Sequence, residues 1–267
     1  MFVTKRNGNR SQCIGLLAYS VLALGLLRSQ APIRPESGSP AHGTIRASWG
    51  MRLRIRERPK ENEMPMTTPL DHHYEPKDLR DRTAYALVQF MRFFADTFFA
   101  RRYGHRAVVL ETVAAVPGMV GGALQHLQSL RLLKGDHGWI RTLLDEAENE
   151  RMHLMAFMYI AQPTRLERLL ILLAQGGFFN LFFLLYMMSP KTAHRVVGYL
   201  EEEAVYSYTE YLAGVDNGTY ANVEAPGIAI DFWDLAPDAR LHDLIIAVRA
   251  DEIRHRDVNH EFADMLA

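Results

Sequence analysis

The chain has 267 residues, of which 30 are Lys or Arg and 31 are Asp or Glu, so its formal net charge is −1. A chain with so little net charge has no overall field that would attract nucleic acid, and we expect no nucleic-acid partner. Its one cysteine, Cys13, excludes an internal disulfide framework and any iron–sulfur or cysteine-ligated zinc site. Any bound metal must therefore be held by oxygen and nitrogen atoms.

The beginning of the chain differs in composition from the rest. Basic residues precede an apolar run at 13–27, and a stretch rich in Pro, Ser and Arg follows it. This pattern fits a signal-like or transit-like leader. It fits equally an upstream extension, because Met64 or Met66 would make a sensible start ahead of the first helix. In either case we expect poor order in residues 1–66 and one folded domain over 67–267.

Beyond Ala84, apolar residues recur at helical spacing through most of the chain. The pattern predicts an all-α fold, with no alternation typical of strands. Turn-forming residues predict one long loop at 214–239. Pro117 is expected to kink its helix without ending it, because the apolar pattern resumes beyond it. The expected helices cover 79–103, 106–132, 138–161, 165–188, 191–213 and 239–265.

Two Glu-x-x-His motifs alternate along the chain with two single glutamates, Glu111 and Glu201. Residues three apart share one face of a helix, so each motif aims a carboxylate and an imidazole at the same point. Four carboxylates and two imidazoles in this order are the ligand set of a carboxylate-bridged di-iron centre. The sequence therefore predicts a four-helix bundle of the ferritin-like di-iron carboxylate type. The two motifs are Glu150-Arg151-Met152-His153 and Glu252-Ile253-Arg254-His255.

The six candidate ligands lie on the apolar stripes of their helices, which predicts that they are buried. In the run of glutamates at 201–203, for example, only Glu201 aligns with Ala204, Val205 and Tyr208. A single Glu-x-x-His pair would arise about once by chance in such a chain, and a glutamate on a helix is usually solvated or paired. Several buried carboxylates together, however, need a cation, because an unpaired buried charge is strongly unfavourable.

The segment from Leu169 to Met188 has no charged residue and is long enough to cross a membrane. A single crossing there would separate the first two ligand helices from the last two, which could then share no metal site. We therefore expect this helix to lie along a membrane surface. The apolar face of 84–102, which ends in a cluster of arginines, fits the same role. Packing between two copies of the chain is the alternative, so the two extra apolar helices are expected to serve interfacial membrane binding and dimerisation.

Four stretches resemble the signature motifs of the alternative oxidases, and the resemblance extends from about Asp78 to the C-terminus. It implies a non-haem di-iron ubiquinol oxidase on one face of an energy-conserving membrane, which reduces dioxygen to water without pumping protons. The domain at 67–267 would then be a di-iron quinol oxidase domain. The stretches are Leu110-Glu111-Thr112-Val113-Ala114-Ala115-Val116-Pro117-Gly118-Met119-Val120, Asn149-Glu150-Arg151-Met152-His153-Leu154, Leu200-Glu201-Glu202-Glu203-Ala204 and Arg249-Ala250-Asp251-Glu252 through His255.

The same resemblance implies roles for individual residues. Tyr208 matches a redox-active catalytic tyrosine, with a hydrogen-bonded core tyrosine as the alternative. Arg92 and Asp96 match quinol-binding residues, but their spacing also fits a plain helix salt bridge. Two Fe ions would be held by Glu111, Glu150, His153, Glu201, Glu252 and His255. The full quinol pocket would be Arg92, Asp96, Arg106, Leu110, Thr112, Leu200 and Glu203. Residues expected to support the ligands are Asn149, Asp251, His126 and His194.

The family implies ubiquinol and dioxygen as substrates and a homodimer on the bacterial inner membrane or, in a eukaryote, the mitochondrial inner membrane. Regulation of the plant kind is in doubt, because Cys13 lies in no recognisable regulatory motif and Ala107 stands where many members have cysteine. The alternative enzyme is a monotopic di-iron quinone-ring hydroxylase. An iron-storage or ferroxidase bundle and a metal-free membrane scaffold are alternatives from other classes.

Overall fold

The computed structural model describes residues 70, 72–99 and 102–266, so the expectation for 1–66 lies outside it. The described residues belong to one unit, Thr68–Ala267. Within them all regular secondary structure is helical, and the prediction of an all-α fold is confirmed. The helices are α2 (Leu79–Phe99), α3 (Tyr103–Leu132), α4 (Trp139–Ala161), α5 (Arg165–Met188), α6 (Pro190–Asp216), α7 (Gly227–Trp233) and α8 (Leu241–Met265).

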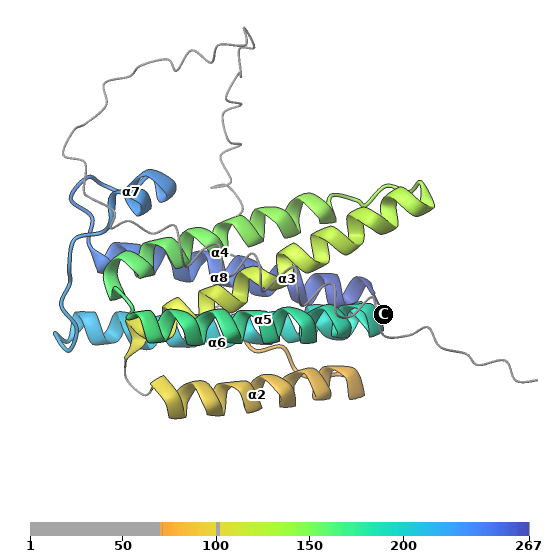
Figure 1. The fold of residues 1–267 in the computed structure, drawn as a ribbon, viewed down its shortest axis with the longest axis horizontal. Coiled ribbons are helices and arrows are strands. Elements are labelled where there is room, and N and C mark those ends of the chain that lie inside the picture. The colour runs from red at the N-terminus through yellow and green to blue at the C-terminus, as the bar shows by residue number, and fades with distance from the viewer. Residues whose placement is uncertain (1–69, 71, 100–101, 267) are drawn as a thin grey trace, which may run out of the picture. The chain divides into compact units, whose positions relative to one another are not determined.

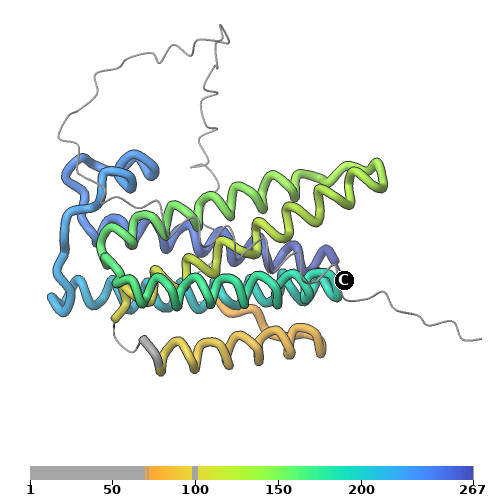
Figure 2. The backbone as a smooth tube through the Cα atoms, viewed as in Figure 1, coloured from red at the N-terminus to blue at the C-terminus, as the bar shows by residue number. Residues whose placement is uncertain are grey.

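Four long helices, α3, α4, α6 and α8, form the bundle (Figure 1). The most extensive contacts join α3 to α4 and α6 to α8. Helix α2 packs against α6, and α5 packs against α3 and α6, as the backbone trace shows (Figure 2). The two extra apolar helices expected from the sequence are therefore α2 and α5, and both lie outside the group of four.

Helix α3 continues through Pro117, as the resumed apolar pattern predicts. The next residue, Gly118, allows α3 and α4 to approach closely. A Cβ atom at Gly118 would lie 2.4 Å from the backbone oxygen of Leu143 and 3.0 Å from the Cβ of Ala147. The first of these separations is too short for any side chain, so a larger residue would push the two helices apart. The close approach brings Glu111, two turns before Gly118, toward α4.

Short polar signals set the beginnings of α5 and α6. The Glu167 amide donates to the Thr164 hydroxyl at 3.3 Å, and the Thr164 amide donates to the Glu167 carboxylate at 2.7 Å. At the start of α6, the Thr192 amide donates to Ser189 at 3.3 Å, and Pro190 occupies the first helical turn. These caps satisfy amide groups that a helix leaves unpaired at its N-terminus. Ser189 alone separates α5 from α6, so the chain reverses sharply there.

The connection after α6 differs from the prediction. Helix α6 continues to Asp216, and the predicted loop at 214–239 contains the short helix α7. Ala229 of α7 is fully buried in the same hydrophobic cluster as Leu241 and Leu244 of α8. Seven residues are too few to show a helical period in a sequence, and for this reason the prediction of an uninterrupted loop was wrong.

The outward faces of α2 and α5 are apolar. Phe90, Phe93 and Phe94 on α2 are 62%, 65% and 56% exposed, and Leu173 and Leu181 on α5 are 63% and 69% exposed. Helices α3 and α5 are both long and apolar enough to cross a membrane, by length and composition alone. Most of the apolar window of α3 is buried in the bundle, whereas only 11% of that of α5 is buried. Helix α5 therefore exposes the apolar surface that its sequence predicts.

A buried arginine ties α2 and the segment before it to α6 and α8. Arg195 on α6 is fully buried and donates to Asp81 of α2 at 2.9 Å and to the hydroxyl of Tyr74 at 2.9 Å. It also pairs with Asp264 and lies 2.8 Å from Nδ1 of His260, both on α8. A buried guanidinium is tolerated only with such partners. The network holds α2 in a fixed place against the bundle.

Candidate metal centre

Six ionisable side chains meet inside the bundle, and each of its four helices supplies at least one of them. All six are at most 8% exposed. The structure therefore brings together every ligand that the two motifs and the two single glutamates predicted. They form two overlapping groups whose donor atoms lie within 4.8 Å of one another, namely Glu111, Glu150, His153 and Glu252, and Glu150, Glu201, Glu252 and His255.

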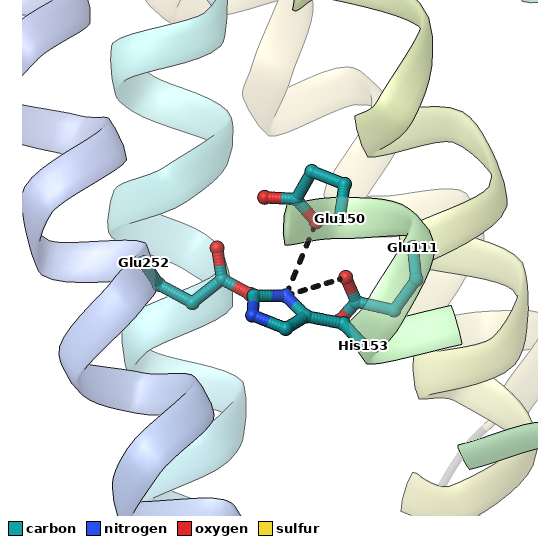
Figure 3. A group of neighbouring side chains, drawn as sticks. All are labelled: Glu111, Glu150, His153 and Glu252. Atoms are coloured by element: carbon teal, nitrogen blue, oxygen red, sulfur yellow. Dashed lines mark hydrogen bonds and ion pairs between the residues drawn. The ribbon is translucent and has the colours of Figure 1, made fainter. Parts of the chain in front are cut away.

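Glu150 and Glu252 belong to both groups, so they lie between two halves of one site. Nδ1 of His153 is 3.3 Å from Glu150 and 3.3 Å from Glu252, and it is 3.2 Å from Glu111 (Figure 3). Nδ1 of His255 is 2.6 Å from Glu150 and 3.6 Å from Glu252. Two shared carboxylates flanked on each side by one glutamate and one histidine are the donor arrangement of a two-metal site.

The electrostatics of this cluster are strained in the absence of cations. Burial, followed by the charges of Glu252 and Glu150, raises the pKa of Glu111 well above the usual glutamate value. The pKa of Glu201 is raised for the same reasons. Burial alone would lower the pKa of His153, but the charges of Glu150 and Glu252 outweigh it and raise that pKa. The four carboxylates of the cluster thus carry more negative charge than its two imidazoles can neutralise.

The hydrogen bonding of the cluster also fits bound metal. Among the described residues, both carboxylate oxygens of Glu150, one oxygen of Glu252 and Nδ1 of His255 have only ion-pair contacts within the cluster, none with the geometry of a hydrogen bond. Buried polar atoms are rarely left in this condition unless they bind an ion or water. Carboxylate oxygen together with imidazole nitrogen suits iron, and the donor set fits two such ions.

The three consecutive glutamates on α6 contact three different partners, because successive helical residues are about 100° apart. Glu201 faces the cluster. Glu202 faces away from it and lies 2.9 Å from Nε2 of His260. Glu203 lies 2.7 Å from Nη1 of Arg92 on α2. The apolar periodicity of α6 had selected Glu201 for the same geometric reason.

Tyr208 lies two turns after Glu201 on α6 and donates a hydrogen bond to Glu111. Its ring is buried and stacks on Phe157, with ring centroids 5.5 Å apart. Burial, and next the negative charge of Glu111, raises the pKa of Tyr208 well above the usual tyrosine value. The hydroxyl is therefore held protonated at the edge of the cluster.

Asp251 holds His153 from outside the cluster. One of its oxygens lies 3.2 Å from Nε2 of His153, the nitrogen on the far side of the ring from the glutamates. The same oxygen accepts hydrogen bonds from Asn149 at 3.0 Å and from the indole of Trp233 at 2.7 Å, and Arg254 donates to the other oxygen. The Trp233 ring also stacks on the His153 imidazole, with centroids 5.6 Å apart. These contacts fix the orientation of His153.

Two residues near the centre were missed by sequence reasoning. Trp233 lies in α7, which is too short to show a helical period, so no sequence pattern indicated its position. Glu146 lies one turn before Glu150 on the same face of α4, and that spacing was the signal that could have found it. It is buried, and burial raises its pKa to about 7. Both of its oxygens accept from the side-chain amide of Asn259 at 3.0 Å.

Of the other two histidines expected beside the centre, neither forms a described hydrogen bond with a candidate ligand side chain. Nδ1 of His194 lies 2.9 Å from the side-chain oxygen of Asn259, and its Nε2 lies 3.1 Å from the hydroxyl of Tyr186. Burial lowers the pKa of His194 to about 4. His126 is exposed on α3. His194 is therefore linked to Glu146 only through Asn259, and His126 lies at the surface.

A narrow cavity adjoins the cluster between α3 and α6. Arg106, Leu110 and Tyr208, all expected from the sequence, are among its lining residues. Arg106 also pairs with Asp96, which lies 3.3 Å from Nε of Arg92. The complete lining is Tyr103, Arg106, Ala107, Leu110, Glu111, Ala204, Ser207, Tyr208 and Tyr211.

Thr112 and Leu200, also expected in the quinol pocket, are not among the residues that line this cavity. The Thr112 hydroxyl donates to the backbone oxygen of Val108 at 2.7 Å, within its own helix. Leu200 packs against the cluster that contains Val88 and Tyr199. The other five form one group, because Glu203, Arg92, Asp96 and Arg106 make a connected chain of ion pairs that ends at the cavity wall beside Leu110.

Comparison with known sequences agrees with this site. The family described as "Alternative oxidase" matches residues 61–264. The "Ubiquinol oxidase, mitochondrial" of Batrachochytrium dendrobatidis is 59% identical over 194 residues, which are 73% of this chain and 61% of that protein. The protein of the same name from Mangifera indica is 58% identical over 200 residues, 75% of this chain and 63% of the relative. The "Ubiquinol oxidase 1a, mitochondrial" of Oryza sativa subsp. japonica is 60% identical over 196 residues, 73% of this chain and 59% of the relative.

The aligned part of this chain thus spans less than two thirds of the length of each of these relatives. Within that part the identity is high, and the family match takes in all of the described helices except the last residue of α8. The chain belongs to the alternative oxidase family.

Proposed function

We propose that this protein is a di-iron ubiquinol oxidase, which oxidises ubiquinol and reduces dioxygen to water. The observation that carries the proposal is the meeting of six buried donors from four helices in two groups that share Glu150 and Glu252. The relatives are named ubiquinol oxidases, which supports ubiquinol as the substrate. In the overall reaction, two ubiquinols give up four electrons and four protons, and one dioxygen becomes two waters.

The donors divide naturally between two iron ions. The two ions, when bound, supply the redox chemistry that passes electrons from the quinol to dioxygen. The glutamates neutralise the charge of the ions, and the imidazoles complete their coordination. One ion would take Glu111 and His153, the other would take Glu201 and His255, and both would share Glu150 and Glu252.

The ion pairs beside the cavity give a quinol a place to bind and to lose its protons. Arg92 holds Glu203 at 2.7 Å and Asp96 at 3.3 Å, so both carboxylates have fixed positions. A quinol hydroxyl that donates a hydrogen bond to one of them can transfer its proton to that oxygen. The cavity has a volume of about 20 Å³, which is smaller than a quinol ring, so the walls that carry Leu110 and Tyr211 would have to move apart to admit the ring.

Tyr208 is placed to deliver an electron together with a proton. Its hydroxyl donates to Glu111, so the proton can move to the carboxylate as the ring loses an electron. Tyr208 also lines the cavity, where a bound quinol would return both the electron and the proton. This arrangement supports a catalytic role for Tyr208 and explains why its hydroxyl must be protonated at the start.

We infer that the protein binds one face of a membrane through α2 and α5. Helix α5 connects α4 to α6, and Glu150 and Glu201 on those helices meet in one cluster, so α5 cannot cross a bilayer between them. Its exposed leucines, with the exposed phenylalanines of α2, would enter the lipid interface. A centre that takes up and releases its protons on one side of the membrane pumps none across it.

The names of the relatives place those proteins in mitochondria, which favours the mitochondrial inner membrane over the bacterial one for this chain. We also infer a homodimer. Its support is the further exposed apolar surface of α3 and the turn after it, where Leu127, Leu130 and Leu133 are 54%, 60% and 91% exposed. Cross-linking of the membrane-bound protein would test the dimer.

The central test is oxygen uptake with a soluble ubiquinol analogue, measured on protein purified in mild detergent. We expect two iron ions per chain and consumption of two quinols per dioxygen. Glu150→Ala should abolish both iron binding and turnover, whereas Glu148→Ala, which removes an exposed glutamate of the same helix, should leave both unchanged. Hydroxylated quinone in the product would instead identify the quinone-ring hydroxylase, and turnover in Glu150→Ala without iron would overturn the assignment.

A further inference from the structure

The two motifs of the centre differ at the residue just before the glutamate. One reads Asn149-Glu150-Arg151-Met152-His153, and the other reads Asp251-Glu252-Ile253-Arg254-His255. The same place in each motif therefore carries a neutral amide in α4 and a carboxylate in α8. The consequences of this difference appear on the outer side of each imidazole.

The imidazole of His153 has an ionic partner on its outer side. Nε2 of His153 lies 3.2 Å from Asp251, which is 2% exposed and belongs to the opposite motif. Trp233 stacks on the same ring and donates to the same carboxylate oxygen at 2.7 Å. His153 is thus held in one orientation by a buried carboxylate that is itself fixed.

The imidazole of His255 has no comparable support. Its Nδ1 faces Glu150 and Glu252, while no described residue hydrogen-bonds to its Nε2. Asn149, which occupies the place that Asp251 occupies in the other motif, turns its amide nitrogen toward Asp251 instead, at 3.0 Å. The amide oxygen of Asn149 is buried and has no hydrogen-bond partner among the described residues.

A carboxylate on the outer nitrogen of a ligating imidazole fixes its tautomer and raises its basicity, and loss of such a partner typically weakens metal binding 10–100-fold. The geometry points to two inequivalent metal positions. The position of Glu111 and His153 binds its ion more tightly and fills first, and the position of Glu201 and His255 fills second and releases its ion first. This inference rests on the two-metal centre of the proposed function and adds the order in which its two positions fill.

One contact acts in the opposite direction. Tyr208 donates a hydrogen bond to Glu111, which draws charge away from a donor of the tighter position. A neutral hydroxyl perturbs a carboxylate less than a buried carboxylate perturbs an imidazole, because the second interaction involves a full charge. Arg254 reduces the effect of Asp251 only in part, because it contacts the other carboxylate oxygen and is itself partly exposed. Asp251 therefore sets the order.

The test is a titration of the metal-free protein with Mn²⁺, followed by electron paramagnetic resonance. The first equivalent should give the signal of an isolated Mn²⁺ ion, and the second should convert it to the signal of a spin-coupled pair. His255→Ala should keep the first binding step and lose the second. Asp251→Asn should raise the first dissociation constant 10–100-fold and change the second much less.

Two further variants control for effects on folding and charge. Glu261→Gln removes one negative charge from an exposed position of the same helix and should change neither constant. Trp233→Phe keeps a ring beside His153 but removes the donor to Asp251, so it should weaken the first step alone, by less than Asp251→Asn does. Circular dichroism would confirm that each variant is folded.

Two equal constants in the unmodified protein, with the coupled signal present from the first addition, would overturn the inference and leave the two-metal centre intact. Equal effects of Asp251→Asn and Glu261→Gln would also overturn it. Failure of the unmodified protein to bind Mn²⁺ at all would contradict the metal centre as well as the order of filling.

Discussion

The hydroxyl of Tyr208 on α6 donates a hydrogen bond to Glu111 on α3, although the two residues are 97 positions apart in the chain. Tyr208→Phe removes this hydroxyl and keeps the ring that stacks on Phe157. We expect iron content to stay the same and the rate of oxygen uptake to fall about 100-fold or more, because an electron can no longer leave with a proton. Metal analysis and an oxygen electrode would measure the two quantities.

The matched control is Tyr159→Phe, since Tyr159 is 63% exposed on α4. It should retain full activity. If Tyr208→Phe turns over as fast as this control, Tyr208 is a core tyrosine and has no part in the chemistry.

Arg92 forms ion pairs with both Asp96 and Glu203. Replacing it tests whether the Arg92–Asp96 pair serves quinol binding or is only a salt bridge within the helix. Arg92→Met keeps most of the apolar stem but releases both carboxylates, and we expect the KM for ubiquinol to rise about tenfold with a smaller effect on kcat. Steady-state kinetics at several quinol concentrations would show the change.

Arg141→Met is the control for this prediction, because Arg141 and Asp145 form an exposed pair with the same four-residue spacing, at 2.6 Å. That substitution should change neither KM nor kcat. A KM for Arg92→Met equal to that of Arg141→Met would show that the Arg92 pair is only a helix salt bridge.

The six donors could be predicted because each lies on the apolar stripe of a long helix. A period of 3.6 residues selects Glu201 from three adjacent glutamates, and the structure places that residue in the cluster. The helix that carries it was predicted to within three residues at its end. In a long amphipathic helix, the 3.6-residue period determines which side chains point toward the core, so buried ligands can be predicted from the sequence.

The supporting residues could not be predicted in the same way. Trp233 reaches Asp251 only because α7 folds back against α4, and this depends on the path of a connection rather than on any period. Thr112 adjoins Glu111 in sequence, yet its hydroxyl bonds to Val108 within α3. Which neighbours of a ligand serve the site is thus decided by tertiary packing.

The stability of the fold should depend on pH through His194. Burial lowers the pKa of this histidine to about 4, whereas in the unfolded chain its pKa is near the ordinary histidine value of 6.5. Between these values the unfolded state binds more protons, so stability is full above 6.5 and falls as the pH drops toward about 4. From the two pKa values, the loss at pH 5 is about 2 kcal/mol.

Urea unfolding at pH 7.5 and at pH 5.0 would measure this loss, with His194→Gln for comparison. The variant removes the titration of His194 but leaves the carboxylates of the centre unchanged, so the difference between the two proteins isolates this residue. Identical changes with pH in both proteins would contradict the prediction.

The close contact between α3 and α4 predicts opposite effects for two glycine substitutions. Gly118→Ala would place a Cβ atom 2.4 Å from the backbone oxygen of Leu143, so the helices must separate. Overpacking of this kind typically destabilises by about 1–3 kcal/mol, and the separation would also move Glu111 away from Glu150. We expect lower stability in urea and a lower affinity for iron.

Gly177→Ala is the matched change in a helix with open space around it, because no atom lies within 4 Å of a Cβ at that position. Alanine there should stabilise the protein by about 0.4–1 kcal/mol, since it restricts the unfolded chain and favours the helix. Iron affinity should not change. Equal stabilities and equal iron affinities for the two variants would show that the spacing of α3 and α4 at Gly118 does not set the geometry of the centre.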